Sequence, residues 1–370
     1  MKILHLPLWF PTKDDIQLGN FIQQQIKLTQ IDHEIFTLTF LSLANCRKIE
    51  FDLNKSNSLT VMYPKSIFKL LTFFHFLRAA NKAFYYLKNN YNFDLIHCHI
   101  AGKNLWFAKH YFKNIPVVLS EHWSGYVNGN FKKLSFFQKK LLLKHINSCD
   151  AVVSVSPFLT TGLIACGVNK PIVEIGNVID VKKKKNSSSF KEMHFLVVAD
   201  LVDQIKNISG VINAISILNE NHPTISLSIV GDGKDATALK KMVNELKLVD
   251  KILFLGRVDQ QEVQRLILQS DCTIVNSNFE TFSMIVLETI FTGNPVICTK
   301  CGGPEQFINK KNGILIEKND VDSLAKAMVY IQQNRKNYSP LVVQDSISNR
   351  YSKDAIRMQL NELYSSILKD

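Results

Sequence analysis

Short runs rich in Val, Ile and Leu alternate along the whole chain with longer stretches of helical periodicity. The short runs are continuously apolar, which is typical of strands covered on both faces, as in a parallel sheet with helices on each side. The pattern therefore predicts an α/β protein built of repeated strand–helix units. The predicted strands are residues 2–6, 34–41, 59–63, 94–99, 116–122, 151–156, 172–176, 194–199, 225–231, 252–255, 272–276, 296–299 and 313–316.

These units fall into two series, which suits a chain of 370 residues at roughly 100–200 residues per domain. The run 181–189 has four lysines followed by polar residues without periodicity, and it is interpreted as the linker. We expect one Rossmann-like domain at 1–180 and a second at 190–350. A final helix at about 354–368 is expected to pack back onto the first domain.

Binding sites in open α/β sheets lie beyond the carboxyl ends of the strands. Two such domains would place both sets of strand ends around one cleft, which is a usual position for a small-molecule site. Motifs at strand ends in both halves are therefore expected to meet.

The most informative segment is 277–297, where Glu280 and Glu288 lie eight residues apart around a helix predicted to begin near Ser283. The backbone N–H groups of Thr281, Phe282 and Ser283 would be free at the helix start, where they suit a phosphate. Glu280 would reach sugar hydroxyls beside that phosphate, and Glu288 would accept from a ribose diol. The alternative is that both glutamates are helix-start and surface charges.

Several motifs in the second half occur in a fixed order, and together they are far more specific than any one of them. Segment 277–297 resembles the E-x7-E motif of the retaining glycosyltransferase family 4, whose two-domain fold is called GT-B. The other segments that resemble this family are 229–233, 254–258, 271–277, 293–305 and 312–316. The resemblance implies two Rossmann-like doubly wound domains and a nucleoside-diphosphate-sugar donor bound by the second domain.

The first half resembles the family more weakly, as expected for a domain that binds a variable acceptor. The resemblance implies an acceptor or phosphate loop at Gly19 and Asn20 and a strand end at His99. It also implies that His122 contacts the transferred sugar, whereas His97 is interpreted as a core residue. Residues 176–180 resemble the family's hinge motif.

Breaking the bond between a sugar and a diphosphate places negative charge on the departing phosphate, which needs a positive partner. The resemblance implies fixed cations and no metal, with His122, Lys206 and Glu280 as the catalytic candidates and retention of anomeric configuration. Asp200 stands where the family has an arginine, so one cation is missing. The acidic pair Asp320 and Asp322 precedes a predicted helix and is interpreted as its N-cap rather than as a metal site.

The net charge of +12 is uneven, because residues 1–180 hold 20 Lys and Arg against 11 Asp and Glu. The segments 66–88 and 131–144 are basic, aromatic and helical in pattern. They fit either peripheral contact with an anionic membrane or burial of their aromatic residues against the sheet. The seven cysteines, including a lone Cys298-x-x-Cys301, are expected to be reduced core residues.

The sequence therefore predicts a metal-independent glycosyltransferase of polysaccharide biosynthesis, cytoplasmic or peripheral on the inner membrane face, with a glycan or lipid-linked acceptor. A non-catalytic nucleotide-sugar or glycan-binding protein of the same fold is the alternative. Nucleic-acid binding is disfavoured, because no basic recognition helix or aromatic RNA-binding signature is present. A nicotinamide-dependent oxidoreductase is disfavoured because Gly231-x-Gly233 lacks the third glycine of the dinucleotide motif.

Overall fold

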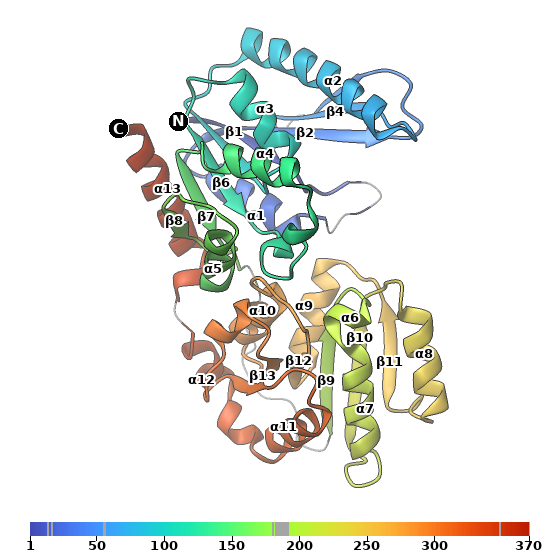
Figure 1. Cartoon of the computed structure of the whole chain (residues 1–370). Coiled ribbons are helices and arrows are strands. Elements are labelled where there is room, and N and C mark those ends of the chain that lie inside the picture. The colour runs from blue at the N-terminus through green and yellow to red at the C-terminus, as the bar shows by residue number, and fades with distance from the viewer. Residues whose placement is uncertain are drawn as a thin grey trace. The chain divides into compact units, whose positions relative to one another are not determined.

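The structure is a computed structural model that describes residues 1–12, 15, 18–54, 57–179, 181, 192–347 and 349–369. The chain forms two compact units, one of Met1–Val178 with Lys353–Asp370 and the other of Ile179–Ser352 (Figure 1). Asp180 of the hinge motif and residues 182–189 of the predicted linker lie outside the described residues.

The first unit is built on an eight-stranded sheet in the order β3-β4-β2-β1-β5-β6-β7-β8. All neighbouring strands are parallel except β3 and β4, which form an antiparallel pair. Its strands are β1 (Lys2–Pro7), β2 (Glu34–Leu43), β3 (Glu50–Asn54), β4 (Ser58–Pro64), β5 (Leu95–His99), β6 (Val117–Glu121), β7 (Ala151–Ser154) and β8 (Ile172–Glu174).

Helices cover this sheet, and the last helix of the chain is one of them. The helices are α1 (Asn20–Thr29), α2 (Lys69–Asn90), α3 (Lys103–Tyr111), α4 (Phe136–Ile146), α5 (Pro157–Ala165) and α13 (Lys353–Lys369). Ile356, Leu360 and Tyr364 of α13 are fully buried in the same apolar cluster as Ile22 and Ile26 of α1. The apolar stripe of the C-terminal helix thus completes the core of the first unit.

One strand of the first unit does not follow the predicted strand–helix alternation. Strand β3 pairs antiparallel with β4, and all of its residues are exposed. An exposed edge strand lacks the continuous apolar run by which buried strands are recognised, so the expectation of parallel units throughout was wrong here. All the predicted strands form, with bounds that differ by at most two residues.

The second unit is a fully parallel six-stranded sheet in the order β11-β10-β9-β12-β13-β14. Its strands are β9 (Met193–Val198), β10 (Ile225–Val230), β11 (Ile252–Gly256), β12 (Cys272–Val275), β13 (Val296–Thr299) and β14 (Gly313–Ile316). Its helices are α6 (Asp203–Lys206), α7 (Ile208–Leu218), α8 (Ala236–Glu245), α9 (Gln260–Gln269), α10 (Met284–Thr292), α11 (Val321–Gln333) and α12 (Pro340–Asp345). The strand order reverses between β9 and β12, and such a switch point is where a doubly wound sheet binds its ligand.

Glycines hold the loops at this switch point close together. A Cβ on Gly231 would lie 1.8 Å from the carbonyl oxygen of Ala199, and one on Gly233 would lie 2.5 Å from that of Leu201. The loop after β10 therefore packs directly against the loop after β9, and only glycine allows this approach. In the described part of the chain, no helix is long and apolar enough to cross a membrane.

Candidate donor site and its partners

Helix α10 begins one residue after Ser283, as predicted, and its first turn has an unusual start. Ser283 lies in the left-handed region, with φ 67° and ψ 88°, and no described side chain caps the helix. The Ser283 hydroxyl is buried and has no hydrogen-bond partner among the described residues. The N–H groups of the first turn and this hydroxyl are thus available to an anion, and the helix dipole favours one.

The loop that leads into α10 is fixed by the two glycines that follow β13. Glu280 and Gly302 form a β-bridge, in which the N–H of Glu280 donates to Cys301 O over 3.0 Å and that of Gly303 donates to Glu280 O over 2.9 Å. A Cβ on Gly303 would lie 2.0 Å from the carbonyl oxygen of Thr281. The glycine pair therefore determines where the start of α10 lies.

Lys206 and Glu280 come together at this loop. The Lys206 Nζ donates to the Glu280 Oε1 over 2.7 Å, and the Ser277 hydroxyl donates to the same oxygen over 2.9 Å. Burial disfavours the charge on Lys206, but the attraction and hydrogen bond to Glu280, together with the nearby Asp200, outweigh it, and the pKa of Lys206 is raised. The ammonium stays charged beside the start of α10, where it can meet a phosphate.

Glu288 lies one turn into α10 and is 7% exposed. The Gln260 side-chain amide donates to the Glu288 Oε1 over 2.7 Å. Burial raises the pKa of Glu288 to about 7, and the hydrogen bond from Gln260 only partly opposes this. This carboxylate is desolvated, with acceptor capacity that one amide does not fill.

Lys206, Glu280 and Ser283 line a pocket of about 130 Å³ at the carboxyl ends of β9 and β12, and Glu288 is not among its lining residues. Asn276 and Ser277 add to its polar lining, and apolar residues of β9, α7, β12 and α10 line the rest. Phe282 contributes only its backbone here, because its ring is buried against Phe307 and Tyr351. Asp200, next to the pocket residue Ala199, pairs with Arg257 over 3.3 Å.

In the first unit, Gly19 is the N-cap of α1, with φ 68°, and Asn20 is the first residue of that helix. A Cβ on Gly19 would lie 2.4 Å from the carbonyl oxygen of Trp9, so both the backbone angle and the contact require glycine. No described side chain caps α1, and its first turn holds no acidic residue. This helix start resembles that of α10 in leaving backbone donors uncapped.

His122 follows the last residue of β6 and is 6% exposed. Its ring packs on Phe21 at a centroid distance of 4.8 Å. Neither ring nitrogen has a hydrogen-bond partner among the described residues, and burial lowers the pKa of His122 to about 3. A buried neutral imidazole with two unused nitrogens is suited to sugar hydroxyls, since one nitrogen donates and the other accepts.

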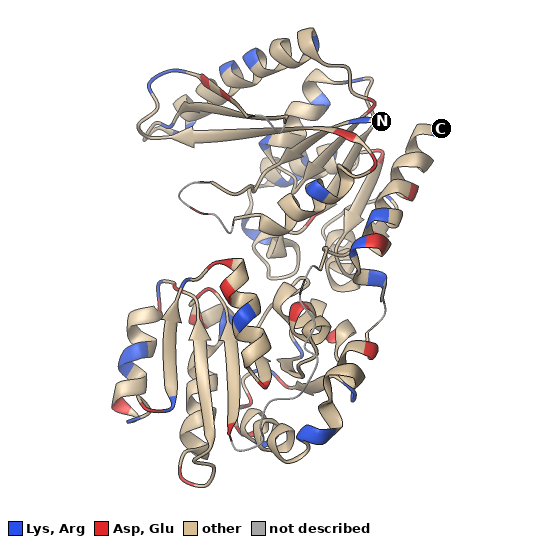
Figure 2. Ribbon diagram, turned by 180° about the vertical axis from the view of Figure 1, so that it is seen from behind, with Lys and Arg blue, Asp and Glu red and all other residues tan. Residues whose placement is uncertain are grey.

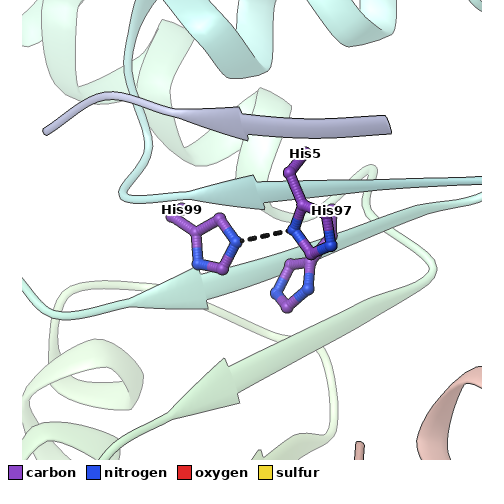
Figure 3. A group of neighbouring side chains, drawn as sticks. All are labelled: His5, His97 and His99. Carbon is purple, nitrogen blue, oxygen red and sulfur yellow. Dashed lines mark hydrogen bonds between the residues drawn. The ribbon is translucent and has the colours of Figure 1, made fainter. Parts of the chain in front are cut away.

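His5, His97 and His99 form a buried cluster, with one nitrogen of each ring within 4.8 Å of those of the others (Figure 3). His5 Nδ1 bonds His99 Nε2 over 3.1 Å, and His5 Nε2 bonds the hydroxyl of Thr29. His97 bonds Tyr364 and Ser120 through its two nitrogens, which confirms it as a core residue. Among the described residues only His99 Nδ1 has no partner, so the three rings belong to one hydrogen-bonded network.

Two motifs outside the site have the structural roles predicted for them. The Asp320 side chain accepts from the backbone N–H of Ser323 over 2.9 Å, which confirms it as the N-cap of α11. All seven cysteines are free and five of them, including Cys298 and Cys301, are buried, but Cys46 and Cys166 are only partly buried, so the prediction of core positions was wrong for these two.

Comparison with known families decides the assignment. Residues 178–342 match the profile described as "Glycosyl transferases group 1", and residues 36–183 match that described as "Glycosyltransferase Family 4". The chain belongs to the family 4 glycosyltransferases.

This glycosyltransferase has characterised relatives with distinct substrates. It is 26% identical over 300 residues to N-acetyl-alpha-D-glucosaminyl L-malate synthase of Bacillus anthracis, covering 75% of this chain and 76% of the relative. It is 24% identical over 253 residues to glycogen synthase of Mycobacterium tuberculosis, covering 64% and 59%. It is 22% identical over 233 residues to the lipopolysaccharide core biosynthesis glycosyltransferase LpsE of Rhizobium meliloti, covering 60% and 66%.

Solved structures confirm the GT-B fold of the glycosyltransferase. Sucrose-phosphate synthase from Thermosynechococcus elongatus superimposes with a TM-score of 0.79 at 17% identity, covering 100% of both chains. HepE of Anabaena in complex with UDP superimposes with a TM-score of 0.78 at 18% identity, covering 99% of this chain and 100% of that one.

Three residues of the glycosyltransferase site were missed by sequence reasoning. Ser277 donates to the same Glu280 oxygen as Lys206 does. Gln260 contacts Glu288, and Arg257 contacts Asp200. Ser277 stood inside the quoted motif, so its position was a usable signal. Gln260 and Arg257 reach the site from the end of β11, and no motif linked that strand end to the two glutamates.

Proposed function

We propose that this glycosyltransferase transfers a sugar from a nucleoside-diphosphate sugar to a glycan or lipid-linked acceptor, with retention of anomeric configuration. The uncapped start of α10, with Lys206 beside it and the buried Ser283 hydroxyl unused, carries the proposal. This arrangement offers N–H donors, a hydroxyl and an ammonium to a diphosphate. Glu280 and Glu288 then accept from hydroxyls of the transferred sugar and the ribose.

The reaction breaks the bond between the anomeric carbon and a phosphate oxygen and forms one between that carbon and an acceptor oxygen. The acceptor proton passes to the departing diphosphate, whose charge Lys206 and the α10 amides stabilise. We propose that no metal is needed, since Asp320 of the only D-x-D segment already caps α11. Turnover in EDTA equal to that in Mg²⁺ is expected, and loss of turnover in EDTA with recovery on adding Mg²⁺ would contradict this point.

The relatives suggest the biological setting. One acts in lipopolysaccharide core biosynthesis and another is a glycogen synthase, while HepE was solved with UDP. We place this chain in the biosynthesis of a cell-surface polysaccharide such as a capsule, lipopolysaccharide or exopolysaccharide. The donor would carry one of the common nucleotides, with UDP the first to test.

A thermal-shift panel of UDP-, GDP- and ADP-sugars tests the donor site. At least one is expected to stabilise the wild type, and this stabilisation should be lost in Lys206→Ala and Glu288→Ala. Equal stabilisation of the wild type and both variants would refute the site. Release of nucleoside diphosphate with a panel of glycan acceptors distinguishes a transferase from a binding protein of the same fold, which would bind donor and release none.

We further propose that the first unit contacts the anionic inner face of the cell membrane. Ile67, Phe68 and Phe74, at the start of α2 and just before it, are 97%, 73% and 53% exposed. Residues 65–90 hold five Lys and Arg and no Asp or Glu, and α4 likewise holds no acidic residue (Figure 2). Exposed aromatic residues beside positive charge suit a lipid surface with anionic headgroups.

Cosedimentation with vesicles tests this contact. The wild type should bind phosphatidylglycerol vesicles better than phosphatidylcholine vesicles, and the double variant Phe68→Ser/Phe74→Ser should lose most of this binding. Leu341→Ser, which changes a residue of α12 that is 69% exposed, is the matched control and should bind as the wild type does. Unchanged binding of the double variant would contradict the proposal.

A further inference from the structure

Two ion pairs lie at or beside the donor pocket, and in each the charges cancel. Lys206 and Arg257 are positive, and Asp200 and Glu280 are negative, each anion pairing with one cation. A nucleoside-diphosphate sugar brings two negative charges to this place. A site with paired charges attracts such a dianion only if one of its cations can leave its partner.

The two pairs differ in how readily they can open. The side chains of Lys206 and Glu280 are 23% and 15% exposed and lie 2.7 Å apart, whereas those of Arg257 and Asp200 are 46% and 71% exposed and lie 3.3 Å apart. A water-exposed ion pair contributes little to stability, because solvent screens it and two long side chains must be ordered to make it. The ion pair between Arg257 and Asp200 can therefore open at small cost.

Arg257 is placed among the donor-site residues by contacts on both sides of it. Its own partner, Asp200, follows the pocket residue Ala199 and lies close enough to Lys206 to raise the pKa of that lysine. Three residues further along, at the first position of α9, Gln260 donates to Glu288. The segment from Arg257 to Gln260 thus contacts both Asp200 and the carboxylate expected to hold the ribose.

We propose that Arg257 is the second cation of the donor diphosphate site and that Asp200 is a positioning residue that holds its guanidinium there. This inference rests on the proposed function. A guanidinium suits the task because its planar fork can bind two phosphate oxygens at once. The arrangement also accounts for the presence of an acidic residue, Asp200, beside an anion site. Asp200 keeps Arg257 at the end of β11 until the diphosphate replaces Asp200 as the partner of the guanidinium.

Isothermal titration with the tightest-binding of UDP, GDP and ADP tests the inference on the full chain. Arg257→Ala should weaken the Kd by about 10–100-fold, the usual effect of losing a hydrogen-bonded charge. Arg265→Ala is the matched control, because Arg265 also belongs to the α9 region, is 52% exposed and pairs with Glu262. It should stay within about two-fold of the wild type.

Changes at Asp200 separate positioning from simple neutralisation. Asp200→Ala should weaken binding less than Arg257→Ala, and Asp200→Glu, which can still hold the guanidinium, should restore most of the affinity. The double variant Asp200→Ala/Arg257→Ala should bind as weakly as Arg257→Ala alone. If the double variant binds like the wild type, Arg257 only neutralises Asp200 and the inference is wrong.

The remaining outcomes separate this inference from the proposed function. A wild type that binds the nucleotide, loses it in Lys206→Ala, but keeps it equally in Arg257→Ala and Arg265→Ala would overturn the role of Arg257 alone. A wild type that binds none of the nucleotides or their sugars would overturn the donor site itself, and the role of Arg257 with it.

Discussion

Replacing Glu288 by Gln is expected to stabilise the protein above neutral pH while abolishing donor binding. The carboxyl is 7% exposed, and burial raises its pKa from an ordinary value of 4.5 to about 7. Glutamine has nearly the same shape, and its carbonyl oxygen can still accept the hydrogen bond that Gln260 donates. The variant thus removes the charge with little change in packing.

The size of the effect follows from the pKa of Glu288. Between pH 4.5 and 7 the folded protein binds more protons at this carboxyl than the unfolded chain does, so stability falls as pH rises through that window. Above pH 7 the full cost of ionising the buried carboxyl is present. At about 1.4 kcal/mol per unit of pKa shift, this cost is roughly 3 kcal/mol. Below pH 4.5 both states are protonated and the cost vanishes. Glutamine carries no such cost at any pH.

Thermal melts of the wild type and Glu288→Gln at pH 5 and pH 8 measure this difference. The variant should melt about 6–12 °C higher at pH 8, since 1 kcal/mol moves the Tm of a domain of this size by roughly 2–4 °C. The gain should be much smaller at pH 5. Glu245→Gln, at a carboxylate that is 64% exposed, is the control and should leave the Tm unchanged. A gain of equal size at both pH values, or no gain at pH 8, would refute the reasoning.

Three further predictions test other parts of the structure. The Cβ of Gly303→Ala would clash with the carbonyl oxygen of Thr281, so this variant should displace the loop and lower the free energy of unfolding by about 1–3 kcal/mol. It should also abolish the donor-induced thermal shift, and an unchanged shift would contradict the role given to the glycine pair. Lys206→Ala should lower kcat/KM by about 10–100-fold, and Lys206→Arg should recover part of it, since either cation can meet both Glu280 and a phosphate. Burial lowers the pKa of four imidazoles, those of His5, His97, His99 and His122, so below pH 6.5 the unfolded chain binds protons that the folded protein does not. The free energy of unfolding, measured in urea, should therefore fall as pH drops from 6.5 toward 4. His97→Gln should reduce that slope by up to about 1.4 kcal/mol per pH unit, and an unchanged slope would contradict the burial argument.

The parts of the fold that could be predicted from sequence are those that depend on residues close together in the chain. Continuous apolar runs marked the strands of both parallel sheets, because such strands are buried on both faces. The caps were equally local: Asp320 accepts from a backbone N–H three residues on, and α10 begins where its motif indicated. Strand β3 was missed because its partner is another segment and its five residues are all exposed.

The site could be predicted only as far as its residues stood in motifs. Lys206 and Glu280 were each recognisable, but their contact joins residues 74 positions apart. The left-handed backbone at Ser283 was not predictable from a serine, because such a conformation costs energy unless the surrounding chain enforces it. Gln260 carries no local signal, and Arg257 stood in the motif at 254–258 with nothing to indicate its partner, since both roles come from the sheet order that brings the end of β11 to the site.

The state of His122 constrains how the proposed reaction handles its proton. An imidazole that is 6% exposed, with a pKa lowered to about 3 by burial, holds a proton too weakly to take one from an acceptor hydroxyl near neutral pH. The same burial leaves both ring nitrogens free to bind two hydroxyls, one as donor and one as acceptor. His122 therefore suits holding the transferred sugar rather than general-base catalysis. The proton of the acceptor hydroxyl then needs another destination, and the departing diphosphate gains basicity as its bond to the sugar breaks. On this reasoning the cations around the diphosphate serve two opposed ends: they must stabilise its growing charge, and they must leave one phosphate oxygen basic enough to accept the proton.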